Sequence, residues 1–175
     1  MKIELDKVEP RPLTDGSYLD EFHCKDPDLE DFLKVDALKG QNLLLSNTTL
    51  LYFDNKLIGY YALSCDAIQL STTEKWKLFG HRRKHYESYP AIKLARMAFV
   101  EDCRNQGCGT LVIEIIAGLV SRLSKMGVGC RFITVDAYPE SVGFYEKKGF
   151  KRNLHKDLRE KNHPSLRLDI FSKWG

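Results

Sequence analysis

Paired cysteines, long apolar runs and a large net charge are all missing from this sequence. Its five cysteines are odd in number and none forms a C-x-x-C pair, which predicts reduced thiols rather than a disulfide framework or a zinc site. No apolar run approaches the ~20 residues of a membrane-spanning helix. The charged segment 1–13 has no apolar core typical of a signal peptide. We therefore expect a cytoplasmic protein without a metal ion.

The composition is that of an ordinary globular protein. Hydrophobic residues make up 43% and charged residues 29% of the 175 residues, which predicts one domain spanning 1–175 with a substantial core. The net charge of +3 permits an anionic ligand or partner without requiring one. No internal repeat or low-complexity tract is evident.

Hydrophobic periodicity predicts alternating strands and helices. Segments 26–41, 110–126 and 139–149 have the spacing or end signals of helices. Expected strands are 2–5, 48–53, 57–65, 91–100, 130–137, a short one near 150, and 166–171. The two strands on either side of Asp54-Asn55 should form a hairpin, because this pair favours a tight turn. The order predicts a mixed α+β (α/β) domain on one central mixed sheet.

Two glycines precede the longest expected helix, in "CRNQGCGT" at Cys103–Thr110. Gly107 and Gly109 could serve only to turn a strand tightly into a helix. The same geometry also suits anion binding, because a helix N-terminus leaves N–H groups without intrahelical partners and carries a partial positive charge. Arg104 would add a fixed positive charge at the edge of such a cradle.

Two common phosphate-binding motifs do not match this segment. A Walker loop ends in Gly-Lys-Ser/Thr, and the lysine is missing after Gly109. The dinucleotide fingerprint needs a third glycine where Val112 stands. What remains is an Arg-x-x-Gly-x-Gly motif between the strand "LARMAFV" and a helix.

That motif resembles the pyrophosphate loop of the GCN5-related N-acetyltransferase (GNAT) family. A second segment, "VGFYEKKGF" at 142–150, is similar to the family's Phe-Tyr signature on a helix that ends in Gly-Phe. The resemblance implies a single domain with a mostly antiparallel twisted sheet, whose central strands splay apart and are flanked by helices. It also implies an acyltransferase that uses acetyl-CoA.

The resemblance assigns cofactor-binding roles to two neighbouring segments. The backbone of Met97, Ala98 and Phe99 would pair with pantetheine and the thioester carbonyl, in the gap between the strands that end near Val100 and Ala137. The pyrophosphate would lie on N–H groups of the loop, where side chains matter little, with Arg104 beside it. These loop residues are Asn105, Gln106, Gly107, Cys108, Gly109 and Thr110.

Tyr145 is the catalytic residue that the resemblance implies. If the neighbouring Phe144 takes the core, Tyr145 can face the cleft and give a proton to the departing coenzyme A thiolate, at modest cost for a pKa near 10. A packing role or a purely positioning hydroxyl is the alternative. One departure from the family is Tyr138, which stands where many members carry an asparagine that contacts the cofactor.

Other ionisable groups near the motifs have less clear roles. Asp136, at the end of a strand, is the preferred candidate for a general base. Glu101 and Asp102 read as solvated loop charges. Cys103 and Cys108 read as small residues that flank the loop, because direct transfer in a ternary complex needs no acyl-cysteine.

The sequence leaves the acceptor open among primary amines: a small amine, a protein amine or an aminoacyl-tRNA. The segments "FHCKDPDLEDFLKVDAL" and "LIGYYALSC" are similar to the toxin-like branch that acetylates aminoacyl-tRNA. A basic stretch with Lys75, Lys77, Arg82, Arg83 and Lys84 could contact a phosphate backbone, or it could be a solvated excursion. In that branch tRNA and an antitoxin would be partners, and a homodimer is compatible with either acceptor class. A non-catalytic acyl-CoA-binding module is the hypothesis from another functional class.

Overall fold

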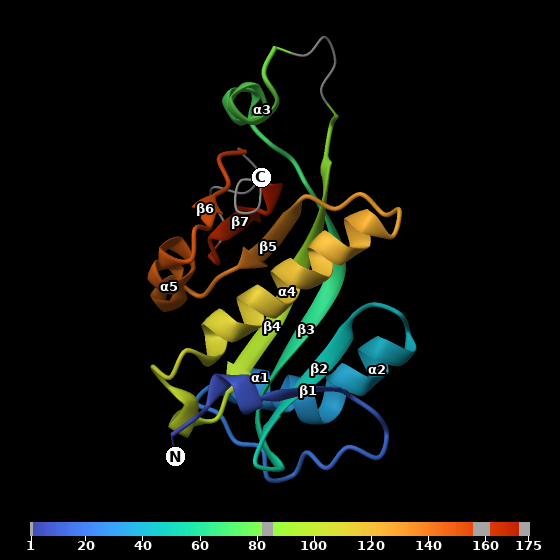
Figure 1. Ribbon diagram of the computed structural model, residues 1–175, viewed down its shortest axis with the longest axis vertical. Helices are drawn as coiled ribbons and strands as arrows, with labels where there is room; N and C mark the ends of the chain where they lie inside the picture. Colours follow the sequence, from blue (N-terminus) through green and yellow to red (C-terminus); the bar gives the residue numbers. More distant parts are fainter. Residues whose placement is uncertain (1, 82–85, 156–161, 172–175) are drawn as a thin grey trace. The chain divides into compact units, whose positions relative to one another are not determined.

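The computed structural model describes residues 2–81, 86–155 and 162–171. It contains two compact units. The first comprises Met1–Ser64 and Leu94–Ile115, and the second comprises Cys65–Lys93 and Ile116–Gly175. Three elements, which Figure 1 labels, contribute residues to both units: strand β3 (Lys56–Ile68), strand β4 (Tyr89–Phe99) and helix α4 (Cys108–Lys125).

Within the described residues, seven strands hydrogen-bond in the order β1-β2-β3-β4-β5-β7-β6. The pairs β1–β2, β2–β3, β5–β7 and β6–β7 are antiparallel, whereas β4 and β5 run parallel. This arrangement confirms the expected mixed, mostly antiparallel sheet, and the parallel pair follows from the helical crossover that α4 makes. The strands are β1 (Glu9–Pro12), β2 (Asn47–Phe53), β3 (Lys56–Ile68), β4 (Tyr89–Phe99), β5 (Phe132–Asp136), β6 (Lys151–Arg152) and β7 (Ser165–Asp169).

The strand expected at 2–5 is wrong. Leu5–Lys7 form a short 3-10 helix, and the first strand begins at Glu9. Ile3 is buried, and its N–H donates to the Gln106 side chain at 2.7 Å. The first residues therefore support the loop before α4 instead of extending the sheet.

The hairpin expected at Asp54-Asn55 is present. Both residues have positive φ, 47° and 60°, as a type I′ turn requires at its two central positions. Asparagine and aspartate tolerate this conformation better than other non-glycine residues. The turn sets the register that pairs Leu50 with Tyr60, and both side chains lie in the core of the first unit.

The helix expected at 26–41 is also present, with an irregular centre. It runs as α1 (Pro27–Asp31), a π-helical segment (Phe32–Asp36) and α2 (Ala37–Asn42). Asp26 caps it, because its side chain accepts from the Asp28 N–H at 3.0 Å. Leu33 and Ala37 are buried with Phe22, Leu50 and Tyr60 in one apolar cluster.

The two later helices follow the sequence expectation closely. Helix α4 (Cys108–Lys125) begins one residue before Gly109, and Gly127 follows it with φ 97°. Its most buried side chains are Val112, Ile113, Ile116, Ala117 and Val120. Helix α5 (Val142–Lys147) follows a 3-10 turn at Pro139–Ser141 and ends before Gly149. In the described residues, no helix combines the length and apolarity needed to cross a bilayer.

Helix α3 (Thr72–Phe79) is anchored to the second unit by a buried ion pair at its N-terminus. The Arg167 guanidinium lies 2.7 Å from the Glu74 carboxylate, and both side chains are under 10% exposed. Glu74 also accepts from the N–H and hydroxyl of Ser71, both at 2.8 Å, and from the Leu154 N–H at 3.3 Å. Because each carboxylate oxygen is hydrogen-bonded, the desolvation cost of this buried charge is offset.

The other end of α3 is anchored by aromatic side chains. The Phe79 ring stacks on Tyr89 with a centroid distance of 4.6 Å. The Arg131 guanidinium also lies over the Phe79 ring, 4.5 Å from its centroid. Arg131 in turn forms a two-fold ion pair with Asp169, at 3.0 and 2.8 Å. With both ends held, α3 is rigidly placed within its unit.

Removing the Glu74 charge should destabilise the protein strongly. In Glu74→Gln, Arg167 keeps its charge in a buried site without its partner, so we expect a loss of about 3–5 kcal/mol in unfolding free energy. Denaturant titration measures this difference. The matched control is Glu146→Gln, whose exposed pair with Arg152 should contribute at most about 1 kcal/mol.

The same experiment has a pH dependence with a defined sign. Burial opposes ionisation of Glu74, but the hydrogen bonds from Ser71 and the charge of Arg167 outweigh it and lower its pKa. The ion pair therefore stabilises the fold fully above the unfolded-state pKa of about 4.3, and this stabilisation is lost as the pH falls through the lower folded pKa. A difference between wild type and Glu74→Gln that stays constant down to pH 2 would contradict this account.

Candidate functional site

The segment before α4 lies entirely in the first unit and is fixed to strand β3. After β4, Val100 donates its N–H to the Ile58 carbonyl at 3.0 Å. A 3-10 turn at Glu101–Cys103 follows, and the Cys103 thiol donates to the same carbonyl at 3.7 Å. Ile58 thus holds both the end of the strand and the start of the loop.

The loop itself has two residues in the left-handed conformation, Asn105 with φ 59° and Gly107 with φ 85°. Between them, Gln106 fixes the loop through its side chain. Its Oε1 accepts from the Ile3 N–H, and its Nε2 donates to the Asp102 carbonyl. The expectation that side chains matter little here is therefore wrong for Gln106, which holds the loop from both sides.

The first turn of α4 lies where the sequence predicts an anion cradle. The N–H groups of Cys108, Gly109 and Thr110 belong to the first helical turn, which leaves them without partners inside the helix. The helix dipole adds partial positive charge at this end. Arg104 is exposed and lies three residues before the half-buried Gly107. The arrangement suits a pyrophosphate, and binding of one stays a prediction.

The cysteines on either side of the loop are structural. Cys103 and Cys108 are 4% and 3% exposed. Burial raises the pKa of the Cys103 thiol to about 12, and burial also raises the pKa of Cys108. Both thiols are therefore protonated at neutral pH and poor nucleophiles, which agrees with the packing role expected from the sequence.

Strand β4 approaches β3 unusually closely at the residues predicted to hold the thioester. A Cβ added to Gly59 would lie 2.4 Å from the Phe99 ring and 2.8 Å from the Ala98 carbonyl oxygen. Ala98 is buried in the apolar cluster of the first unit, while Met97 and Phe99 are half-buried. Because Gly59 has no Cβ, the backbone of Met97–Phe99 can lie this close to β3. The sequence analysis missed this role, although a glycine inside a strand is a signal for close backbone approach.

Tyr145 lies in the second unit, on α5, and is more enclosed than expected. It is 6% exposed, whereas Phe144, expected in the core, is only half-buried. Its ring packs edge-to-face against Phe144 and Phe150, with centroid distances of 5.1 and 5.2 Å. Among the described residues, none hydrogen-bonds to the Tyr145 hydroxyl, which leaves it available to a ligand.

The burial of Tyr145 changes its acid strength. Desolvation raises its pKa to about 12, above the value near 10 assumed from the sequence. The hydroxyl therefore stays protonated across the physiological range. Full proton transfer from it to a thiolate with a pKa near 8.5 would be uphill by roughly 5 kcal/mol.

The candidate base, Asp136, forms an ion pair. The Lys93 ammonium lies 2.7 Å from its Oδ2, and the two residues stand on the neighbouring strands β5 and β4 of the second unit. The role of Asp136 as a general base stays a prediction.

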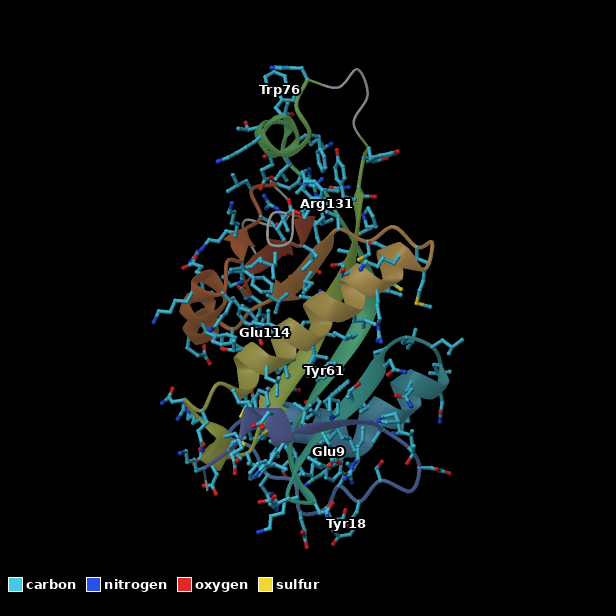
Figure 2. The ribbon with its side chains drawn as sticks, viewed as in Figure 1. Glu9, Tyr18, Tyr61, Trp76, Glu114 and Arg131 are labelled. Atoms are coloured by element: carbon cyan, nitrogen blue, oxygen red, sulfur yellow. The ribbon has the colours of Figure 1, made fainter. Side chains whose placement is uncertain are left out.

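Tyr138 and the basic stretch complete the predicted set. The Tyr138 ring packs edge-to-face on His163 within the second unit, with a centroid distance of 4.9 Å. In the basic stretch, Lys75 and Lys77 lie on α3, next to Trp76, which is 54% exposed (Figure 2). Arg82, Arg83 and Lys84 lie outside the described residues.

These features define a class of protein. A mixed sheet in which a central strand leads through a left-handed glycine loop into a long helix is suited to a phosphate-bearing cofactor. The family model for the acetyltransferase (GNAT) domain matches residues 23–166. The chain therefore belongs to the GNAT acetyltransferase family, as the sequence resemblance indicated. It is an acyl-CoA-dependent N-acetyltransferase with acetyl-CoA as the acyl donor.

Individual relatives are similar over most of the chain. A tRNA-acetylating toxin from Mycobacterium tuberculosis (strain H37Rv) is 25% identical over 138 residues, which are 78% of this chain and 80% of the relative. The structure of AtaT complexed with acetyl-methionyl-tRNAfMet has a TM-score of 0.76 at 22% identity, over 95% of this chain and 96% of that one. A mutant AtaT toxin bound to the C-terminus of the antitoxin AtaR and acetyl-CoA has a TM-score of 0.73 at 19% identity, with the same coverage. These two structures confirm the fold.

A side chain at Gly59 should weaken acetyl-CoA binding. Gly59→Ala places a Cβ 2.4 Å from the Phe99 ring and 2.8 Å from the Ala98 carbonyl oxygen, so the ring and the β4 backbone must move away. We expect the Kd for acetyl-CoA to rise at least tenfold, about 1.4 kcal/mol, measured by calorimetry. The control is Gly118→Ala on α4, where no other atom lies within 4 Å of the added Cβ. Equal affinity of Gly59→Ala and wild type would show that this stretch of β4 does not bind the cofactor.

Proposed function

We propose that this enzyme transfers the acetyl group of acetyl-CoA to the α-amine of an aminoacyl-tRNA. The observation that carries the proposal is the similarity to the tRNA-acetylating toxin, because it extends over 78% of this chain and 80% of that protein. The same relationship supports an antitoxin as a protein partner.

The surface of α3 supports an RNA acceptor. No acidic residue occurs between Lys75 and Tyr86, a stretch that contains five lysines and arginines. Trp76 and Lys77 are exposed on α3, and the anchoring of both helix ends holds them in place. A basic surface with an exposed aromatic ring is typical of nucleic-acid binding, because the cations contact phosphates and the ring can stack on a base.

The chemistry of the amine supports the same acceptor. An α-amine with a pKa of 7.7–8.0 is roughly 10–20% neutral at pH 7, whereas a lysine amine with a pKa near 10.4 is about 0.04% neutral. A site whose candidate base, Asp136, is ion-paired with Lys93 thus suits an α-amine better than a lysine. For an acceptor like lysine, Asp136 would be the residue to accept the proton.

The proposed transfer is a direct attack. The neutral amine attacks the thioester carbonyl carbon, a C–N bond forms, the C–S bond breaks, and the amine releases one proton to solvent. We assign the pyrophosphate to the N–H groups from Asn105 to Thr110 with Arg104 beside them, and the thioester arm to the backbone of Met97, Ala98 and Phe99. Tyr145 donates a hydrogen bond to the departing sulfur, and the thiolate then takes one proton from solvent.

Removing the Tyr145 hydroxyl tests its role. Tyr145→Phe keeps the ring that packs against Phe150, so we expect kcat to fall on the order of 10²-fold with little change in the Kd for acetyl-CoA. Because the pKa of Tyr145 is raised to about 12, wild-type kcat should not decline up to about pH 10. Tyr18→Phe, at an exposed tyrosine, is the control. An unchanged kcat in Tyr145→Phe would leave this residue a packing role alone.

Reversing charge on α3 tests the RNA acceptor. The double variant Lys75→Glu/Lys77→Glu should acetylate aminoacyl-tRNA at least tenfold less efficiently. The log–log salt slope of tRNA binding should flatten by about 0.7–0.9 for each lost phosphate contact. Turnover of a small amino-acid ester should stay within twofold of wild type. The matched control, Arg122→Glu/Lys125→Glu on α4, changes the net charge equally. Equal losses in both double variants would mean that only overall charge matters.

A further inference from the structure

The helix of residues 27–42 departs from α-helical geometry at one place in the first unit. Its π-helical segment, Phe32–Asp36, is a conformation that is rare and occurs often at functional sites. Just before it, the Tyr60 hydroxyl donates to the Leu29 carbonyl at 2.6 Å. Tyr60 is fully buried, and burial raises its pKa, so it remains a neutral donor that fixes this point of the helix.

The π-helical segment begins with Phe32, whose ring contacts two side chains. It stacks on Tyr60, with a centroid distance of 6.0 Å and an angle of 23° between the rings. The guanidinium of Arg96 lies over the Phe32 ring, 5.4 Å from its centroid. This distance is within the range of a cation–π interaction.

Arg96 stands directly before the β4 residues assigned to the thioester. Alternate residues of a strand share a face, so Arg96 lies on the same face as Ala98, whose side chain is packed in the apolar cluster with Leu33 and Ala37. Arg96 is exposed, however. Its Nη1 donates to the neighbouring Ala95 carbonyl at 3.0 Å, and it forms no ion pair with any residue that the structure describes.

We propose that Arg96, supported by Phe32, binds the terminal nucleotide of the aminoacyl-tRNA and thereby positions the acceptor amine. The proposal rests on the proposed function. A guanidinium plane held on an aromatic ring offers a flat cationic surface that can stack on a base or hydrogen-bond to a phosphate. Its place one residue before Met97 puts this surface next to the strand where the acetyl group is expected. Arg96 is therefore a substrate-binding residue with no part in proton transfer.

The first test compares an acceptor that carries a nucleotide with one that lacks it. We expect Arg96→Ala and Arg96→Met to lower kcat/KM for aminoacyl-tRNA at least tenfold, an effect of the size of one lost base contact. For the methyl ester of the same amino acid, kcat/KM should stay within twofold of wild type, as should the Kd for acetyl-CoA. Phe32→Leu should show the same selectivity in a weaker form.

The second test measures binding without turnover. Its probe is a short single-stranded RNA that ends in adenosine, followed by fluorescence anisotropy at several salt concentrations. If Arg96→Lys keeps the affinity and Arg96→Ala flattens the salt slope by about 0.7–0.9, the contact is to a phosphate. If Arg96→Lys loses the affinity and the slope is unchanged, the contact is stacking on a base.

Two results would overturn the proposal. One is an equal loss of activity on the ester and on aminoacyl-tRNA, since that would assign Arg96 to the fold of the site. The other is RNA binding that is the same in wild type and Arg96→Ala. A wild-type enzyme that acetylates the ester but no aminoacyl-tRNA would instead refute the proposed function, and the RNA-binding result would still decide the role of Arg96.

Discussion

The close approach of β3 and β4 at Gly59 is the constraint on which the proposed cofactor site of the first unit depends. The backbone of Ala98 and the ring of Phe99 occupy the space that any other residue at 59 would fill. One residue earlier, the Ile58 carbonyl accepts from both Val100 and Cys103. A single stretch of β3 thus fixes the strand proposed to hold the thioester and the loop proposed to hold the pyrophosphate.

In the second unit, a buried ion pair positions helix α3. Glu74 and Arg167 are a costly pair to bury, and replacing such a pair with apolar residues is often neutral for stability. What the pair provides here is a defined position for α3, whose outer side carries Trp76 and Lys77. The aromatic contacts of Phe79 with Tyr89 and Arg131 hold the other end. A surface that binds a large substrate benefits from such rigidity, because less entropy is lost on binding.

Local signals in the sequence were sufficient for most of the fold. The type I′ turn at Asp54-Asn55, the Asp26 cap and the glycine loop before α4 each depend on residues within a few positions of one another, and each was predicted. The segment at 2–5 was misread as a strand because its actual partner, Gln106, lies about a hundred positions away. The π-helical segment at Phe32 was also not predicted, because its contacts come from residues distant in the sequence. Tyr60 and Arg96 pack on Phe32 from strands β3 and β4.

For the candidate site, the sequence indicated which residues could take part in the chemistry, but not the side chains that surround them in the fold. It pointed to Tyr145 and Asp136, but not to the burial that raises the pKa of Tyr145 or to the Lys93 ammonium beside Asp136. Both effects come from side chains brought together only by folding. In the proposed mechanism, the raised pKa of Tyr145 favours a hydrogen bond to the departing sulfur over full proton transfer.

The most direct measurement is the location of the transferred acetyl group. Purified enzyme, labelled acetyl-CoA and a mixture of aminoacyl-tRNAs would be incubated, and the products digested and analysed by mass spectrometry. The account predicts label on the α-amine of the amino acid esterified to tRNA, lost when the tRNA is deacylated beforehand. Label found only on protein lysines or on free small amines, with aminoacyl-tRNA unmodified, would contradict it.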